Sequence, residues 1–266
     1  EVSTIDEGIV FQRKNGTAFQ TLLSAPYKEL IYTLGNIYKQ IDSAFSGCYI
    51  DLQYYGVAVK YCHFLLKNGF AFTYPSVSST QETHMLGIRD LFLVLKSQNP
   101  QTVIANDYVP IAHNTGTVIF GKNSGGKTVY MRSVGISQIL AQAGLPIVAK
   151  SATIHCYKSI IAQFAQSEKA GIEGGIGRFE QEAKEMAQVI DMVTENSLVL
   201  FNEVFQSTSY EEGAVCLADI LDYISSVPSK WILVTHLQQI RPLLPFGTMF
   251  LTVGNGYKIK DCQRCL

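Results

Sequence analysis

Residues 1–69 carry apolar side chains at helical spacing. The apolar positions between residues 25 and 66 are Leu30, Ile31, Leu34, Ile37, Tyr38, Ile41, Leu52, Tyr55, Val57, Ala58, Tyr61 and Leu65. Apolar residues three and four positions apart lie on one face of a helix, so the spacing predicts two long helices, at residues 25–44 and 50–66, that pack as a pair. Asn68 and Gly69 supply a helix stop. The segment is therefore predicted to be all-α, and its pattern does not distinguish it from an ordinary small helical bundle.

From Phe70 onward, short apolar runs alternate with amphipathic helices. Buried strands are predicted at residues 117–120, 198–201 and 231–234, and helices at residues 129–142, 178–194 and 210–226. Strands that are apolar on both faces are typical of a sheet covered by helices on both sides. The predicted fold class is α/β, with a mostly parallel sheet flanked by helices and preceded by the all-α segment.

Three further stretches have weaker patterns. Residues 72–77 are predicted to form a short edge strand, because Pro75 is tolerated at the edge of a sheet. Residues 91–95 form an apolar run that fits either a strand or a short helix. Residues 167–177 are rich in glycine and are predicted to form a mobile loop.

The composition is that of a globular protein. Apolar residues make up 47% of the 266 residues, charged residues make up 16%, and the formal net charge is −1. A near-neutral chain lacks the broadly basic surface of a protein that binds nucleic acid mainly through phosphate contacts, although a local basic patch is compatible with it. The sequence has no apolar run of 18 residues and no signal peptide, so we expect no contact with a membrane. Because the chain begins Glu-Val, we expect it to be a piece of a longer protein.

The six cysteines do not predict a zinc site. Cys262 and Cys265 have the spacing of metal ligands, but a zinc site needs a second pair and the sequence has none. Scattered cysteines fit a reducing compartment. An intracellular location, in the cytoplasm or the nucleus, is therefore expected.

Residues 121–128, Gly-Lys-Asn-Ser-Gly-Gly-Lys-Thr, match the phosphate-loop pattern. Glycines let the backbone turn tightly, and the N–H groups of the loop and of the following helix then point at an anion. Lys127 is expected along the β- and γ-phosphates of a nucleotide, and the Thr128 hydroxyl on Mg²⁺. The predicted phosphate-binding residues are Gly121, Asn123, Ser124, Gly125, Gly126, Lys127 and Thr128. A chance glycine-rich turn is the alternative, and the strand before the loop and the helix after it argue against that.

Polar residues follow two of the predicted strands. Asn202 and Glu203 end one strand, and Thr235 and His236 end another. In phosphate-loop ATPases such a position carries an acidic residue for Mg²⁺ and, in one large class, a Glu that polarises the attacking water. Glu203 fits the second role, whereas Asn202 stands where Asp is expected and acts on the metal only through a bound water. His236 is placed to sense the γ-phosphate; the alternatives are a surface carboxylate at Glu203 and a structural histidine at His236.

Four blocks of sequence resemble the MutS family of DNA mismatch-repair ATPases. They are the phosphate loop with its continuation to Arg132, residues 197–203 as the second nucleotide motif, Thr208 and Ser209 followed by Gly213 as the dimer-contact loop, and residues 235–237 as the switch histidine motif. The similarity runs from about Phe70 to about Leu251. It implies a phosphate-loop NTPase of the ABC type over residues 70–266, with residues 1–69 as the helical lever that joins the ATPase to a DNA clamp.

The resemblance also implies a composite active site in a dimer. Two ATPase domains pair, as a homodimer or a heterodimer, and each completes the other's site with residues 174–182, including Gly177 and Arg178. The family usually has Ser at the position of Gly177, where it touches the partner's γ-phosphate. Val103 and Ile104 are expected to lie against the adenine base, the alternative being ordinary core residues. DNA would be bound by domains outside this chain.

The implied function is ATP binding and hydrolysis with Mg²⁺, coupled to a DNA clamp through dimerised ATPase domains. Asn202 and Gly177 depart from the family pattern at positions that serve the metal and the γ-phosphate, which favours slow hydrolysis. The alternatives are a divergent but working ATPase, a nucleotide switch that hydrolyses little, and a MutS-related protein that acts on recombination intermediates or ribosomes instead of mismatches.

Overall fold

The computed structural model describes residues 2–5, 8–11, 19–80, 82–110, 113–165 and 177–261. The chain divides into two compact units, Glu1–His63 and Phe64–Leu266. None of the helices in the described part of the chain has both the length and the apolar character needed to cross a membrane. The expected glycine-rich loop at residues 167–177 lies almost wholly outside the described residues.

The first unit contains an antiparallel hairpin and most of one long helix. Strands β1 (Val2–Ile5) and β2 (Gly8–Phe11) pair in the hairpin, so the expectation of an all-α segment is wrong for these residues. Helix α1 (Phe19–Lys67) is continuous over 49 residues, so the predicted pair of helices is also wrong. A glycine inside a helix costs only about 1 kcal/mol, and Gly47 therefore does not end it.

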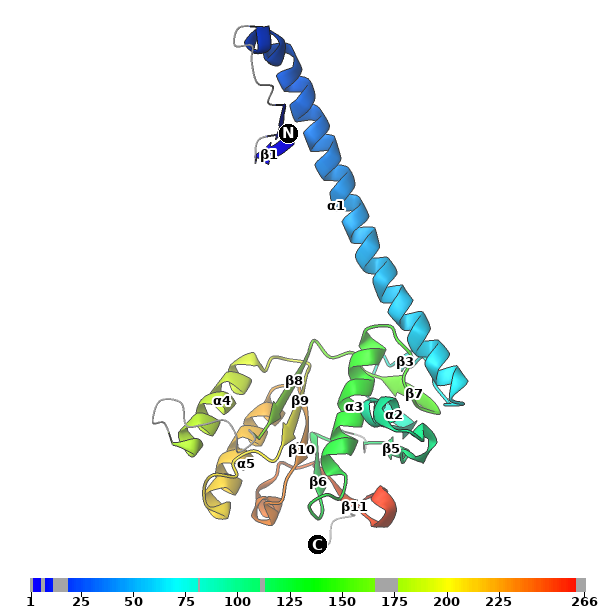
Figure 1. The fold of residues 1–266 in the computed structure, drawn as a ribbon. Coiled ribbons are helices and arrows are strands. Elements are labelled where there is room, and N and C mark those ends of the chain that lie inside the picture. The colour runs from blue at the N-terminus through cyan, green and yellow to red at the C-terminus, as the bar shows by residue number, and fades with distance from the viewer. Residues whose placement is uncertain are drawn as a thin grey trace. The chain divides into compact units, whose positions relative to one another are not determined.

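The second unit is built on a six-stranded sheet with the order β12-β11-β6-β10-β9-β8 (Figure 1). Its strands are β6 (Gly116–Phe120), β8 (Ser159–Phe164), β9 (Ser197–Asn202), β10 (Lys230–Val234), β11 (Met249–Val253) and β12 (Ile259–Asp261). Every neighbouring pair is parallel except β11 and β12. The mostly parallel sheet predicted from the sequence is therefore confirmed.

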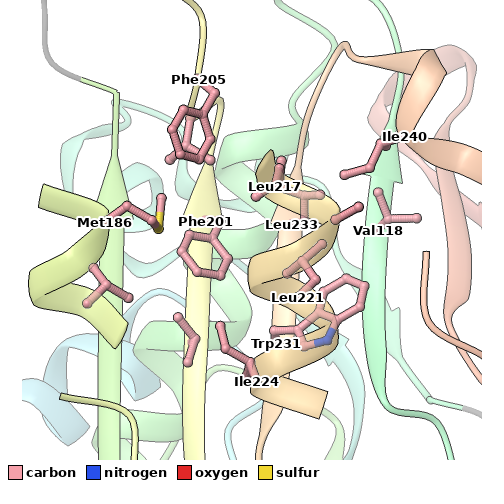
Figure 2. Close-up of a cluster of buried hydrophobic side chains, with 14 of the residues drawn as sticks. Val118, Met186, Phe201, Phe205, Leu217, Leu221, Ile224, Trp231, Leu233 and Ile240 are labelled. Carbon is pink, nitrogen blue, oxygen red and sulfur yellow. The ribbon is translucent and has the colours of Figure 1, made fainter. Parts of the chain in front are cut away.

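Helices cover both faces of this sheet. Helix α3 (Lys127–Gln142) packs on one face, and helices α4 (Arg178–Met192) and α5 (Tyr210–Ser226) pack on the other. Successive strand residues point to opposite faces, so Phe201 contacts the α4 and α5 side whereas Leu200 contacts the α3 side (Figure 2 shows the first of these clusters). Burial on both faces explains why the central strands are almost entirely apolar.

A smaller four-stranded sheet with the order β3-β7-β4-β5 lies in the same unit. It is formed by β3 (Ser76–Val77), β7 (Ser151–Ile154), β4 (His84–Ile88) and β5 (Asn106–Tyr108). The expected edge strand at residues 72–77 is thus shortened to β3. The ambiguous run at 91–95 is a helix, α2 (Leu91–Lys96), because the Asp90 carboxylate accepts a hydrogen bond from Leu93 N and caps it. Short 3₁₀ turns follow at η1 (Pro100–Thr102), η3 (Gln238–Leu243) and η4 (Asn255–Tyr257).

Gly116→Ala is expected to lower the free energy of unfolding by about 1–3 kcal/mol, because it overpacks the core. A Cβ at Gly116 would lie 2.0 Å from Cε2 of Trp231, a buried ring on the neighbouring strand β10. Urea denaturation of the variant measures the loss. Gly47→Ala is the control, since it adds a methyl group with no atom within 4 Å and favours a helix. An unchanged denaturation midpoint for Gly116→Ala would contradict this account of the core.

Candidate functional site

The predicted phosphate loop joins strand β6 to helix α3, as the sequence indicated. Gly126 caps α3 with a φ of 91°, in the left-handed region that favours glycine. At Gly125, a Cβ would lie 2.9 Å from the Lys122 carbonyl oxygen. A larger residue at either position would be strained, at Gly126 by its backbone angle and at Gly125 by the nearby carbonyl. The loop leads directly into the first turn of a 16-residue helix. The unpaired N–H groups of such a helix start favour bound anions.

Lys127 is buried, and its ammonium group points back into the loop. Its Nζ donates to the carbonyl oxygens of Gly121 at 3.0 Å and Lys122 at 3.1 Å. The same Nζ lies 3.2 Å from His236 Nε2 and 3.6 Å from Glu203 Oε1. Burial lowers the pKa of Lys127, and the Glu203 carboxylate opposes that shift. A cation held in this way is placed to exchange neutral carbonyl partners for phosphate oxygens.

The two predicted strand-tip residues meet at the same edge of the sheet. Strand β10 lies between β6 and β9, and all three are parallel, so their carboxyl ends lie together. Glu203 adopts a φ of 53°, and its N–H donates to Val234 O at 2.8 Å. Its Oε1 lies 2.8 Å from His236 Nε2, and its Oε2 accepts from Gln206 Nε2 at 2.9 Å. The structure thus brings Glu203, His236 and Lys127 together, while their catalytic roles remain predictions.

Thr128, the residue after Lys127, contacts Asn202 at the end of β9. The Thr128 hydroxyl donates to Asn202 Oδ1 at 2.6 Å. A hydroxyl and an amide oxygen are hard ligands that suit Mg²⁺. In the described part of the chain no group of three or more His, Cys, Asp or Glu side chains could hold a metal alone. A Mg²⁺ ion here would therefore complete its coordination with phosphate oxygens and water, as is usual for this metal.

A cavity of about 590 Å³ opens beside the phosphate loop. Val103 and Ile104 line it together with residues 124–130, so the positions predicted for the base share one cavity with most of those predicted for the phosphates, although Gly121 and Asn123 are not among the lining residues. Neither Val103 nor Ile104 is buried. Ligand sites of small molecules have volumes of roughly 300–1,000 Å³. The cavity has the size of a nucleotide site, and contact of Val103 and Ile104 with a base stays a prediction.

Tyr257 also lines this cavity, and sequence reasoning missed it. Its ring lies so close to the loop that a Cβ on Gly126 would be 3.2 Å from Tyr257 Cδ1. Asn106 fixes the segment: its Nδ2 donates to Tyr257 O at 3.1 Å, and its Oδ1 accepts from Ile259 N at 2.9 Å. Tyr257 is exposed and lines the same cavity as Val103 and Ile104, and such an aromatic ring suits stacking on a base. No local pattern could reveal this contact, because Asn106 and Tyr257 are 151 residues apart.

The residues predicted to contribute to a partner's nucleotide site, Gly177 and Arg178, lie at the start of α4. Gly177 caps α4 in an extended conformation, and a Cβ there would meet no atom within 4 Å. Arg178 is the first residue of α4, and its side chain is outside the described part. Gly177 is not among the residues that line the cavity of its own chain.

The predicted dimer-contact loop is held by hydrogen bonds within the chain. Ser209 caps α5 through Glu212 N at 3.2 Å, and Thr208 Oγ1 donates to Glu212 Oε2 at 2.7 Å. Hydrogen bonds from Thr208 and Ser209 lower the pKa of Glu212. Ser207 Oγ also donates to Glu182 Oε2 at 2.6 Å, which joins this loop to α4. These contacts give the loop a structural role within the chain, and its contact with a partner remains a prediction.

Comparison with known proteins gives one family and several relatives. Residues 117–246 match the family model MutS domain V. Endonuclease MutS2 of Streptococcus mutans serotype c is 30% identical over 168 residues, which are 63% of this chain and 20% of that protein. Endonuclease MutS2 of Clostridium novyi is 33% identical over 144 residues, 54% of this chain and 18% of the relative. Endonuclease MutS2 of Streptococcus uberis is 30% identical over 186 residues, 70% of this chain and 22% of the relative. The chain thus spans about a fifth of the length of the relatives it matches.

Proposed function

Because residues 117–246 belong to the MutS domain V family, an ABC-like phosphate-loop ATPase fold, we propose that this chain is the ATP-binding and hydrolysing part of a MutS-related protein. The observation that carries the proposal is the convergence of Lys127, Glu203 and His236 at the mouth of the phosphate loop, with separations of 2.8–3.6 Å. A cation, a carboxylate and an imidazole at one point suit the charge and proton transfers of triphosphate hydrolysis.

Each residue of the site has a proposed role. The backbone of residues 121–128 holds the phosphates, and Lys127 neutralises their charge. Thr128 holds Mg²⁺ directly, and Asn202 holds it through a water. Held there, Mg²⁺ would offset the negative charge of the phosphates. Glu203 orients the attacking water and accepts its proton, and His236 senses the γ-phosphate.

The site is completed by a second copy or a related chain. MutS-family ATPases form dimers, and we propose a homodimer or heterodimer in which Gly177 and Arg178 face the partner's nucleotide. Gly177 offers no hydroxyl to that nucleotide, so the N–H groups at the start of α4 would make the contact. Thr208 and Ser209 would lie in the dimer contact. We further propose residues 70–266 as the ATPase domain and residues 1–69 as the connecting lever.

The relatives bear on which branch of the family this protein belongs to. The compared relatives carry the name Endonuclease MutS2, and none of these names refers to mismatch repair. This favours the alternative of the sequence analysis, a MutS-related protein acting on recombination intermediates or ribosomes, over a mismatch-repair protein. We propose that DNA or another large substrate is bound by parts of the protein outside this chain. Such a role places the protein inside the cell, in the cytoplasm or the nucleus.

Asn202→Asp tests the metal side of the proposal. Replacing the amide with a carboxylate adds a negative charge at the proposed Mg²⁺ site, where Thr128 Oγ1 lies 2.6 Å from Asn202 Oδ1. The Mg²⁺ concentration for half-maximal hydrolysis of ATP is expected to fall about tenfold, because ligand charge strengthens Mg²⁺ binding. Phosphate release measured over a Mg²⁺ series gives this value. Asn36→Asp, on α1, adds the same charge elsewhere and is the control.

The same variant separates two candidate functions. An amide at the metal position supports the second candidate, a nucleotide switch that hydrolyses little. If Asn202→Asp raises the maximal rate by about 100-fold or more, the switch is favoured, since that is the size of effect of restoring one stabilising group. If the Mg²⁺ requirement does not change at all, Asn202 does not act on the metal and this part of the proposal is wrong.

A further inference from the structure

One wall of the cavity is not part of the phosphate loop and belongs to α2 and the residues that follow it. Leu93 of α2 lines the cavity together with Val103 and Ile104. Leu93 and Ile104 are exposed to solvent, with fractions of 39% and 40%, and both line the cavity. We call Leu93, Val103 and Ile104 the apolar wall. It can contact the base of a nucleotide only if it lies at a fixed distance from the loop that holds the phosphates.

The buried carboxylate of Asp90 holds α2 in place through hydrogen bonds. Asp90 is 2% exposed, and its carboxylate accepts three hydrogen bonds. Leu93 N donates to Oδ1 at 2.8 Å, Arg132 Nη2 donates to Oδ1 at 2.9 Å, and Arg132 Nε donates to Oδ2 at 2.6 Å. A buried carboxylate with a bidentate arginine has one favourable orientation, so this pair holds α2 in place.

Arg132 lies on the helix that begins at the phosphate loop. It follows Lys127 by five residues on α3, and its guanidinium lies 5.4 Å from the centre of the Phe92 ring of α2. Its contacts with Asp90 and Phe92 therefore join the apolar wall to the element that presents the phosphate site. These two contacts therefore tie α2 to α3.

Arg89 makes a second connection, at the other end of the wall. Its Nε donates to the carbonyl oxygen of Val103 at 2.9 Å. Its guanidinium lies 5.5 Å from the centre of the buried Phe70 ring. Two consecutive residues, Arg89 and Asp90, thus hold Val103 and α2 respectively, and neither of the two is required by the chemistry proposed above.

We propose that Asp90 and Arg132, assisted by Arg89, are positioning residues that set the spacing between the phosphate loop and the apolar wall for the base. They thereby make the site prefer a nucleotide, which carries a base, over a bare polyphosphate. This inference rests on the proposed nucleotide function of the cavity. Asp90 also lines the cavity, and we propose that the pair acts on the bound base through the position of Leu93, Val103 and Ile104.

The test compares two ligands that share phosphates and differ in the base. Isothermal titration calorimetry measures binding of ATP and of inorganic tripolyphosphate, both with Mg²⁺, to the 266-residue chain and to two variants. Arg132→Gln removes the bidentate partner, and the double variant Asp90→Asn with Arg132→Met removes the pair without leaving a buried unpaired charge. In the double variant, Asn keeps an oxygen that can cap Leu93 N.

In both variants the Kd for ATP is expected to rise about tenfold, the loss of one good base contact, while the Kd for tripolyphosphate stays within about twofold of the original. Lys184→Gln is the control, because it breaks an exposed ion pair with Glu180 and should change neither affinity. Equal ATP affinity in the double variant overturns the inference, and so does an equal loss for both ligands, which would mean a general role in folding. If the unaltered chain binds neither ligand, the proposed function itself fails, and this inference fails with it.

Discussion

Glu203→Gln lowers the rate of ATP hydrolysis by about 10²–10³-fold, if Glu203 handles the attacking water, and leaves ATP binding nearly unchanged. Glutamine keeps the shape of the side chain and cannot accept the proton of the water. The carboxylate stands at the tip of β9, within 2.8 Å of His236 and 3.6 Å of Lys127, where the γ-phosphate is expected. Phosphate release at saturating ATP and Mg²⁺ measures the rate, and calorimetry with ATP measures the binding.

Glu195→Gln is the matched control for this variant. Glu195 is exposed and lies just before β9, at the opposite end of the strand from Glu203. Loss of the same charge there is expected to leave the rate within a small factor of the original. A Glu203→Gln variant that hydrolyses ATP as fast as the unaltered chain would remove Glu203 from the mechanism.

Lys127→Met is expected to weaken ATP binding by about 100-fold, because it removes the charge-assisted hydrogen bonds to the β- and γ-phosphates. Met keeps the apolar part of the side chain, which matters because Lys127 is only 4% exposed. Calorimetric titration with ATP and Mg²⁺ gives the affinity. The variant also loses the two hydrogen bonds that Lys127 Nζ donates to the carbonyl oxygens of Gly121 and Lys122. Its thermal unfolding should therefore be measured together with its ATP affinity.

Lys158→Met provides the comparison for Lys127. Lys158 is exposed and precedes β8, at the edge of the sheet away from the phosphate loop. Its removal is expected to change ATP affinity little, since an exposed charge at that distance is screened by salt. Equal affinities for Lys127→Met and the unaltered chain would place the nucleotide elsewhere.

The part of the site that the sequence predicts well is the part made by neighbouring residues. The phosphate loop is contained in eight consecutive residues, and its strand and helix both have clear patterns. Glu203 and His236 could be placed because each follows a strand that is buried on both faces, and parallel strands end at one edge. The meeting of these two side chains then follows from the sheet itself.

The features that sequence reasoning missed depend on distant contacts or on weak patterns. Asp90 and Arg132 are 42 residues apart, and no spacing rule connects them. Strand β8 alternates irregularly between buried and exposed residues, so its pattern does not distinguish it from a loop. The apolar spacing predicts helices at residues 25–44 and 50–66 but carries no signal that they join, and α1 runs through Gly47 because one glycine costs a helix only about 1 kcal/mol.

The central claim is that a triphosphate lies in the loop between β6 and α3, within reach of residues from the neighbouring strand tips. A crystal structure of the chain with Mg²⁺ and a non-hydrolysable ATP analogue tests it most directly. The account predicts that Lys127 Nζ leaves the carbonyls of Gly121 and Lys122 for the β- and γ-phosphates, with the γ-phosphate beside Glu203 and His236. An analogue bound outside this cavity, with Lys127 still donating to the same two carbonyls, would contradict it.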